Sequence, residues 1–388
     1  MRDDLLTSVA ERFGTPTYLY DLTRVTRQVE RLRRAFPGAL LRYAVKANAN
    51  GALLRHLAGL GVGAEALTLG ELERALRAGF RPQDVLLGGP GPTPALARRA
   101  VEAGVELVSL DGEGAYAAWR QVEAPRVRFL VRLNPAFDPH THEHLATAAG
   151  YSKFGVEAGA AAALAEEVAA SGRLAGFHVH AGSMLDDPEV ARLVVAALEP
   201  LYQRFPGLEL VDLGGGFAVP DAPLEAFASA YAAFAARHGV TPLLEPGRFV
   251  VADAGVLLTR VLHVKEGERR HVIADAGMAD LLRPALYGAH HPVRLVGGGR
   301  EAHAGAATDV DGPLCENADR LAQDVELPAV RPGDLLAVER AGAYGFAMAS
   351  NYASSLRPAE VTWDGVEARL ARRRERPEDL WRLEAPLD

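Results

Sequence analysis

The sequence predicts an α/β protein made of a closed (β/α)8 TIM barrel and a second, mainly antiparallel β domain. Two observations predict the barrel. From about residue 40, short β-rich apolar segments alternate with longer amphipathic or alanine-rich segments, and eight such β segments fall within about 210 residues. A third observation predicts the second domain: after residue 256, prolines, glycines and β-branched runs replace helical periodicity. An open doubly wound sheet is the alternative to the barrel.

The predicted strands follow one another in an order that a parallel barrel requires. In chain order they are "LLRYAVKA", "VGAEAL", "DVLLGG", "VELVSL", "VRFLVRLNP", "LAGFHVHAG", "LELVDLGGG" and "PLLEPGRF". Helical segments such as "TPALARRAVEAG" lie between them and several end in glycine, as helix C-termini often do. We therefore place the barrel at residues 22–256 and most of the β domain at residues 257–388.

Composition favours a small-molecule partner. The 388 residues suffice for two cores, the formal net charge is -8, and the arginines are scattered among carboxylates, which argues against nucleic acid or an anionic membrane surface. The single cysteine, Cys315, excludes an internal disulfide and fits a reducing compartment. The charged N-terminus lacks a signal-peptide core, and no window approaches the ~18 apolar residues of a membrane span. We expect a cytoplasmic protein.

Polar residues end several of the predicted strands. Lys46 ends the first strand, His180 the sixth and Glu245 the eighth, while Gly214, Gly215 and Gly216 follow the seventh. Because the strand C-termini of such a barrel carry its chemistry, we expect these residues on one rim.

Each of these residues also has an ordinary structural explanation. Lys46 is either a desolvated amine able to form a Schiff base or a surface lysine that closes a strand. The glycines either approach a phosphate with their N–H groups or form a tight turn. Glu245 pairs either with a protonated ring nitrogen or with a core arginine such as Arg132. His180 either offers its face to a flat ring, with Ser183 bonding the same ligand, or is a satisfied core histidine.

Together the rim residues suit a flat, phosphorylated aldehyde with a pyridine ring, namely pyridoxal 5'-phosphate. Lysine, histidine, glutamate and glycines would then meet its aldehyde, ring face, ring nitrogen and phosphate, respectively.

Motifs along most of the chain resemble those of the alanine-racemase-fold decarboxylases that use pyridoxal phosphate. They are "YAVKANAN", "HVHAGS", "DLGGGF", "EPGRFVVADAG", "GPLCEN" and "AGAYGFAMASNYASSLRPAEV". "LLRPALYGAHH" and the C-terminal block resemble the branch of that family that acts on diaminopimelate. The resemblance runs from about residue 15 to residue 383, and it implies that residues 1–21 belong to the β domain.

The resemblance implies a cofactor role for each rim residue. Lys46 would bind the aldehyde, His180 would stack on the ring, and Glu245 would pair with the ring nitrogen. The phosphate would lie on Gly214, Gly215 and Gly216, and the same cofactor site would include Ser183, Gly247, Arg248 and Tyr344.

The resemblance also implies the reaction and the substrate contacts. The reaction would be the decarboxylation of meso-2,6-diaminopimelate to L-lysine and carbon dioxide, the last step of lysine biosynthesis. Cys315 would be the catalytic proton donor and would reach the neighbouring subunit of a homodimer with shared sites. The substrate would contact Arg248, Arg283, Tyr287, Glu316 and Tyr344.

Several positions depart from the family pattern and leave the substrate preference open. "GGPGPT" and "HAGSM" differ from the usual loops, Glu65 stands where aspartate is expected, and His290 replaces a common tyrosine. A related decarboxylase of another basic amino acid is therefore an alternative.

Two further alternatives belong to other classes. His140, His142 and His144 of "PHTHEH" would suit a metal-dependent barrel hydrolase, although the other strand ends offer few metal ligands and we expect no metal. A non-catalytic cofactor-binding homologue would lack the lysine, the acid or the cysteine, and all three are present.

Overall fold

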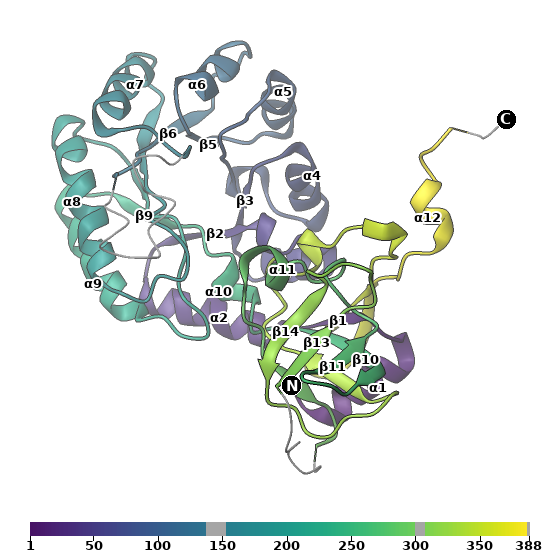
Figure 1. The fold of residues 1–388 in the computed structure, drawn as a ribbon. Helices are drawn as coiled ribbons and strands as arrows, with labels where there is room; N and C mark the ends of the chain where they lie inside the picture. The colour runs from purple at the N-terminus through teal and green to yellow at the C-terminus, as the bar shows by residue number, and fades with distance from the viewer. Residues whose placement is uncertain (137–152, 299–306, 386–388) are drawn as a thin grey trace. The chain divides into compact units, whose positions relative to one another are not determined.

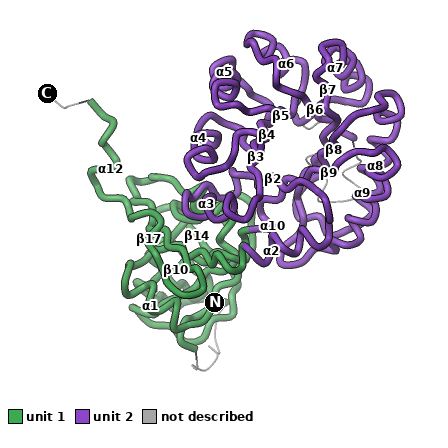
Figure 2. The backbone as a smooth tube through the Cα atoms, turned by 180° about the vertical axis from the view of Figure 1, so that it is seen from behind, with its two compact units in different colours: residues 1–25, 251–388 green, residues 26–250 purple. Residues whose placement is uncertain are grey.

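The chain forms two compact units. The computed structural model describes residues 1–136, 153–298 and 307–385. One unit, the barrel unit, comprises Thr26–Val250, and the other, the β unit, comprises Met1–Val25 with Val251–Asp388 (Figure 2). The chain therefore starts in the β unit, builds the whole barrel unit and then returns.

The barrel unit is built on eight parallel strands. They are β2 (Leu40–Ala44), β3 (Gly63–Ala66), β4 (Val85–Leu87), β5 (Leu107–Leu110), β6 (Arg128–Arg132), β7 (Leu174–His178), β8 (Leu210–Asp212) and β9 (Thr241–Leu244). Each strand pairs with the next, and β2 pairs in parallel with β9 through Leu40↔Leu243 and Leu41↔Leu244. This last pairing closes the sheet, so the predicted barrel is confirmed and the open sheet is excluded.

Buried aliphatic side chains from six neighbouring strands form one core cluster of the barrel. They are Leu86, Leu107, Leu130, Ala175, Leu210 and Leu243. The interior is thus a packed core, as in other barrels of this type, and ligands are restricted to its ends.

Helices surround the strands of the barrel unit (Figure 1). They are α2 (Leu22–Ala35), α3 (Gly51–Gly59), α4 (Leu69–Ala78), α5 (Pro94–Ala103), α6 (Glu113–Arg120), α7 (Ala158–Ala170), α8 (Glu189–Arg204), α9 (Leu224–His238) and α10 (Arg248–Val251). Local sequence explains their ends: Thr93 caps α5, Pro94 occupies its first position, and Gly104 ends it with a φ of 90°.

The β unit contains a mainly antiparallel sheet, as expected. Its strands are β1 (Thr17–Asp21), β10 (Gly255–Lys265), β11 (Arg270–Ala274), β12 (Val293–Leu295), β13 (Thr308–Asp311), β14 (Arg320–Val325), β15 (Leu335–Val338), β16 (Ala359–Trp363) and β17 (Ala368–Arg372). The main order is β14-β13-β11-β10-β1-β16-β17, and only β1–β16 and β11–β13 pair in parallel among the described strands.

The N-terminal segment is central to this sheet. Strand β1 lies between β10 and β16, and α1 (Asp3–Phe13) packs Leu6 and Val9 against Leu19 and Val361. The short helices α11 (Arg283–Tyr287) and α12 (Pro377–Trp381) complete the unit. Among the described residues, no helix is long and apolar enough to cross a lipid bilayer.

Candidate active site

The predicted rim residues of the barrel follow four neighbouring strands. Lys46 follows β2, His180 follows β7, Gly214–Gly216 follow β8 and Glu245 follows β9. Strands β7, β8, β9 and β2 are consecutive around the closed sheet. The sequence-predicted positions therefore form one continuous arc at the C-terminal rim.

Lys46 lies on a 3-10 turn, Val45–Ala47, directly after β2. Its Nζ is 3.6 Å from Oε2 of Glu65, since strand pairing sets Ala44 opposite Glu65. The Lys46 side chain is 40% exposed, whereas that of Glu65 is 3% exposed. Lys46 thus keeps part of its exposure to solvent in this structure, because the residue stands on the turn beyond the strand.

The turn that follows β9 packs closely against the Lys46 turn. A Cβ added at Gly247 would lie 3.1 Å from the Cβ atoms of both Ala44 and Ala47. The Ala44 N–H also donates to the Pro246 carbonyl. The backbone of "EPGR" thus supports the turn that carries the lysine, and Arg248 begins α10 directly after it.

The three glycines after β8 leave room for nothing larger than hydrogen. A Cβ at Gly215 would lie 2.3 Å from the Glu245 carbonyl oxygen. At Gly216, where φ is +90°, a Cβ would lie 2.1 Å from the Gly182 carbonyl oxygen. Bare backbone at this rim allows the close approach of N–H groups that an anion such as phosphate requires.

His180 is neutral at physiological pH. Its Nδ1 accepts a hydrogen bond from the Gly215 N–H at 3.2 Å, which ties the loop after β7 to the glycine loop. Burial lowers the pKa of His180 to about 3, with a smaller contribution from Arg132. A neutral imidazole on this rim is suited to stacking on a flat ring. Ser183, further along the same loop, is exposed.

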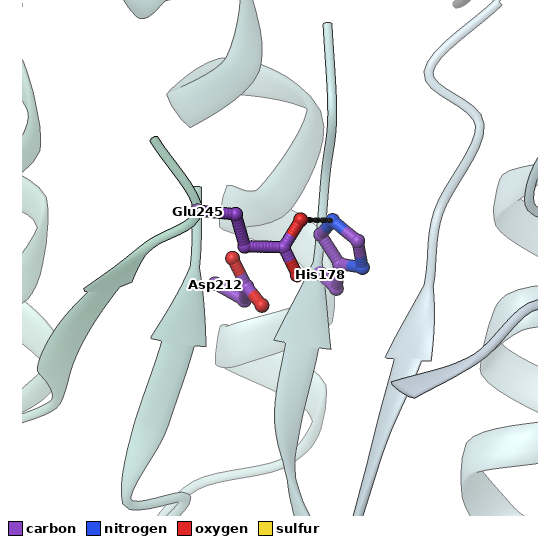
Figure 3. A group of neighbouring side chains, drawn as sticks. All are labelled: His178, Asp212 and Glu245. Atoms are coloured by element: carbon purple, nitrogen blue, oxygen red, sulfur yellow. Dashed lines mark ion pairs between the residues drawn. The ribbon is translucent and has the colours of Figure 1, made fainter. Parts of the chain in front are cut away.

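Glu245 belongs to a buried group that also contains His178 and Asp212 (Figure 3). Nε2 of His178 is 3.7 Å from Oε2 of Glu245. One side-chain nitrogen or oxygen atom from each of the three residues lies within 4.8 Å of those of the other two. Figure 3 shows the Glu245 carboxyl group directed toward the His178 ring, with Asp212 beside it. The predicted alternative, an ion pair with Arg132, is not formed; Arg132 bonds Asp111 at 2.8 Å.

Burial controls the charge of this group. It raises the pKa of Asp212 to about 7 and raises the pKa of Glu245 well above its usual range, with Asp212 and Glu65 adding to the latter shift. Burial also lowers the pKa of His178 well below its usual value. Burial therefore favours the protonated form of Glu245 and the neutral form of His178.

The barrel site fits a flat, phosphorylated ring with a basic nitrogen. Among the described residues, the buried atoms Nε2 of His178, Oδ2 of Asp212 and Oε2 of Glu65 have no hydrogen-bond partner. Buried polar atoms normally have one, so their presence beside a bare glycine loop indicates a place for a polar ligand. His178 and Asp212 were not singled out from the sequence, although both are polar residues that end apolar strands, the same signal that identified Lys46.

Three of the predicted substrate residues lie together within the β unit. The Arg283 guanidinium, at the start of α11, lies 5.7 Å from the Tyr287 ring centroid and 5.8 Å from that of Tyr344. Two aromatic faces therefore orient one cation.

Cys315 and Glu316 lie on a separate loop of the same unit and are both exposed. Asp319 holds this loop, because its carboxylate accepts the N–H groups of Leu314 and Met278, each at 2.6 Å. The three histidines of "PHTHEH" lie outside the described residues.

Comparisons with known proteins agree in pointing to one group of enzymes. Residues 22–252 match the family described as pyridoxal-dependent decarboxylase, pyridoxal binding domain. The chain is 42% identical over 380 residues to diaminopimelate decarboxylase of Deinococcus radiodurans, covering 98% of both proteins. The crystal structure of diaminopimelate decarboxylase from Helicobacter pylori complexed with L-lysine matches with a TM-score of 0.88 and 33% identity, over 97% of this chain and 98% of that one. A lysine/ornithine decarboxylase from Vibrio vulnificus, at 24% identity and a TM-score of 0.80, over 93% of this chain and 98% of that one, shares the fold.

Proposed function

The chain belongs to the diaminopimelate decarboxylase family of pyridoxal-dependent decarboxylases, and we propose that it converts meso-2,6-diaminopimelate to L-lysine and carbon dioxide. The carboxyl group lost would be that of the D-centre, and the reaction would be the last step of lysine biosynthesis. One observation supports this most strongly: a lysine, a bare glycine loop and a buried glutamate whose pKa is raised follow neighbouring strands of the barrel.

The residues of the barrel rim suit pyridoxal 5'-phosphate, which supplies an electron sink for the bond that breaks at Cα. Lys46 would hold its aldehyde carbon, Gly214–Gly216 and Ser183 its phosphate, and Glu245 its ring nitrogen. His180, being neutral, would cover one ring face without adding charge. Gly247 and Arg248 would line the same site.

Glu245 would control the proton on the ring nitrogen. Burial raises the pKa of Glu245, so its carboxyl group is suited to hold or release a proton opposite that nitrogen. A carboxylate facing a protonated ring nitrogen would favour electron withdrawal into the ring, as decarboxylation requires.

The β unit would supply the substrate contacts. An arginine fork suits a carboxylate, so Arg283, held between Tyr287 and Tyr344, would bind the distal carboxylate together with Arg248. Glu316 would receive the distal ammonium group, and Cys315 would return a proton to the product carbanion. We further propose that both come from the neighbouring subunit of a homodimer, and that the enzyme works in the cytoplasm.

A direct assay tests the reaction. Purified protein with pyridoxal 5'-phosphate is incubated in parallel with meso-diaminopimelate, lysine, ornithine and arginine, and carbon dioxide release is measured. Release only from diaminopimelate is expected. Preferential release from one of the other three amino acids would replace the substrate assignment and keep the reaction class.

The Lys46→Ala variant tests the cofactor assignment. It should lose both turnover and the absorbance of the Schiff base between lysine and cofactor, while full turnover in this variant would overturn the mechanism. Metal analysis of the same samples addresses the other class of function, the metal-dependent hydrolase for which the sequence offers His140, His142 and His144. Stoichiometric metal without cofactor absorbance would favour a metal-dependent hydrolase.

A further inference from the structure

We propose that His178 is a positioning residue for Glu245: held by Ser109 through Nδ1, it directs its Nε2–H at the Glu245 carboxyl group, orients that group and stabilises its charged form. This inference rests on the cofactor assignment made above and names a role for residues outside that assignment.

The geometry describes a short chain of polar groups across the barrel interior. Ser109, on β5, places its Oγ 2.7 Å from Nδ1 of His178, which ends β7. On the other side of the same ring, Nε2 faces Oε2 of Glu245 at 3.7 Å. All three residues are buried, so water does not compete for these contacts.

Because burial favours a neutral His178, it matters which of its two ring nitrogens carries the proton. Burial keeps the pKa of His178 well below its usual value, with Arg132, His180 and Lys46 acting in the same direction. A neutral imidazole has one N–H and one acceptor nitrogen. If the Ser109 hydroxyl donates to Nδ1, the single N–H is at Nε2 and points to Glu245. If Nδ1 carries the proton instead, Nε2 has only a lone pair to offer.

Glu245 needs such a donor because its other neighbours oppose its charge. Asp212 and Glu65 raise the pKa of Glu245 in addition to burial, whereas Lys46 acts against them. Asp212 is itself held by the Gly214 N–H at 2.9 Å, so it stays close to Glu245. If a ring nitrogen took the proton of Glu245, the O–H bond would be replaced by an N–H bond and a buried carboxylate would be left. The Nε2–H group of His178, which faces Glu245 at 3.7 Å and has no hydrogen-bond partner among the described residues, would then be placed to stabilise that charge.

Two substitutions at His178 separate this role from simple packing. In His178→Gln the side-chain amide nitrogen reaches about as far as Nε2, so the donor to Glu245 is retained. In His178→Asn the amide reaches only as far as Nδ1, so the contact with Ser109 is retained and the donor to Glu245 is lost.

The deciding measurement is the nitrogen NMR resonance of holoenzyme loaded with cofactor labelled with ¹⁵N in its ring. In the wild type and His178→Gln this resonance should lie at the position of a protonated ring nitrogen. In His178→Asn it should move toward the neutral position. Cofactor affinity, followed by absorbance titration, should fall roughly tenfold to a hundredfold, the loss expected for a hydrogen bond to a charged group. A wild-type resonance and affinity in His178→Asn would overturn the proposal.

His238→Asn is a matched control. His238 also faces a carboxylate, Glu199, with Nε2 3.2 Å from Oε1, but this pair joins the outer helices α9 and α8. The control should leave the ring resonance and cofactor affinity unchanged; an effect equal to that of His178→Asn would show that the change is not local and would overturn the proposal. If His178→Asn does not fold, Ser109→Ala decides, since it removes only the group that fixes Nδ1; an unchanged resonance there would also count against the proposal.

The same samples separate this inference from the proposed function. If the wild type decarboxylates diaminopimelate but the ring resonance is the same in His178→Asn, the inference alone is overturned. If the ring resonance changes in His178→Asn but the wild type releases no carbon dioxide from diaminopimelate, the inference is supported and the substrate assignment is overturned. A wild type that binds no cofactor overturns both.

Discussion

At the scale of single residues, burial raises the pKa of several carboxyl groups of this protein. Asp212 and Glu245 in the barrel unit and Asp280 in the β unit are all buried, and burial is the largest cause of the raised pKa of each. A raised pKa means that the folded protein holds a proton that the unfolded chain releases. These groups therefore link stability and chemistry to pH.

Asp280 provides a test of this linkage away from the catalytic residues. Its pKa is raised to about 7, and its carboxyl group accepts a hydrogen bond from the Gly277 N–H at 2.9 Å. Between its unfolded pKa, about 4, and its folded pKa the folded state binds more protons, so the free energy of unfolding falls as pH rises through this window. Stability from this group is fully present below about pH 4 and is lost progressively as the pH rises to about 7.

Asp280→Asn should remove that pH dependence, because an amide cannot ionise. Between about pH 5 and pH 8, we expect the free energy of unfolding to fall by about 2 kcal/mol more in the wild type than in the variant, measured by urea unfolding of the apoprotein. The exposed Asp4, whose side chain is 69% exposed, provides the control substitution Asp4→Asn, which should behave as wild type. Equal losses in wild type and Asp280→Asn would contradict the assignment.

Arg283 tests the substrate contacts at the same scale. Arg283→Ala should raise KM for diaminopimelate by a factor of roughly 30 or more, which corresponds to losing about 2–4 kcal/mol from a charge-assisted clamp. Arg283→Lys should raise KM less than Arg283→Ala does, because a lysine keeps the charge without the planar fork. Cofactor affinity should hardly change in either variant. Arg331→Ala, at an arginine 77% exposed, is the control, and an unchanged KM in Arg283→Ala would remove the substrate assignment while sparing the chemistry.

At the scale of elements, the site is made by the turns that follow parallel strands. The loops after β7, β8 and β9 contact one another through backbone atoms, as the distances at Gly215 and Gly216 show. Such contacts need glycine for two reasons: the positive φ at Gly216 and the absence of space for a Cβ at either residue. The glycine loop therefore shapes the rim as well as offering N–H groups.

Gly216→Ala should weaken cofactor binding more than it weakens the fold. Its Cβ would collide with the Gly182 backbone, so the loop must move away from the rim. Gly239→Ala is a matched control, because Gly239 also has a positive φ, +66°, yet a Cβ there meets nothing within 4 Å. The control should cost about 1 kcal/mol of stability and leave cofactor affinity unchanged, as measured by thermal unfolding and absorbance titration. Equal cofactor affinities for the two variants would argue against a phosphate site at this loop.

At the scale of the whole molecule, the chain divides the proposed work between two units. The cofactor residues lie mainly in the barrel unit, whereas Arg283, Tyr287, Cys315, Glu316 and Tyr344 lie in the β unit. We propose that the subunit holding Lys46 receives Cys315 and Glu316 from its partner. This arrangement makes a strong prediction about mixtures of inactive variants.

Lys46→Ala and Cys315→Ala, each expected to be nearly inactive, should restore activity when their subunits are exchanged. In random mixing half of the dimers are hybrids, and each hybrid has one intact site of two, so about a quarter of wild-type activity is expected. Each variant unfolded and refolded alone is the control. Hybrid dimers verified by mass spectrometry that remain inactive would show that the sites are not shared.

The sequence by itself determined the features that depend on local pattern. The alternation of apolar strands and amphipathic helices predicted eight strands, and polar residues at the strand ends identified Lys46, His180 and Glu245, because these signals are carried by neighbours in the chain. The resemblance in motifs identified the family. The roles assigned to individual site residues stay predictions.

Tertiary structure alone decided the features that depend on groups far apart in the chain. Closure required β2 to meet β9, and the partners of Glu245 are set by which side chains share the barrel interior: His178 and Asp212 lie near it, whereas Arg132 bonds Asp111. The exposure of Lys46 and the grouping of Arg283 with Tyr287 and Tyr344 were likewise decided by the fold. The physical reason is that burial and electrostatic coupling are properties of distances in space, and the pattern of one chain segment does not contain them.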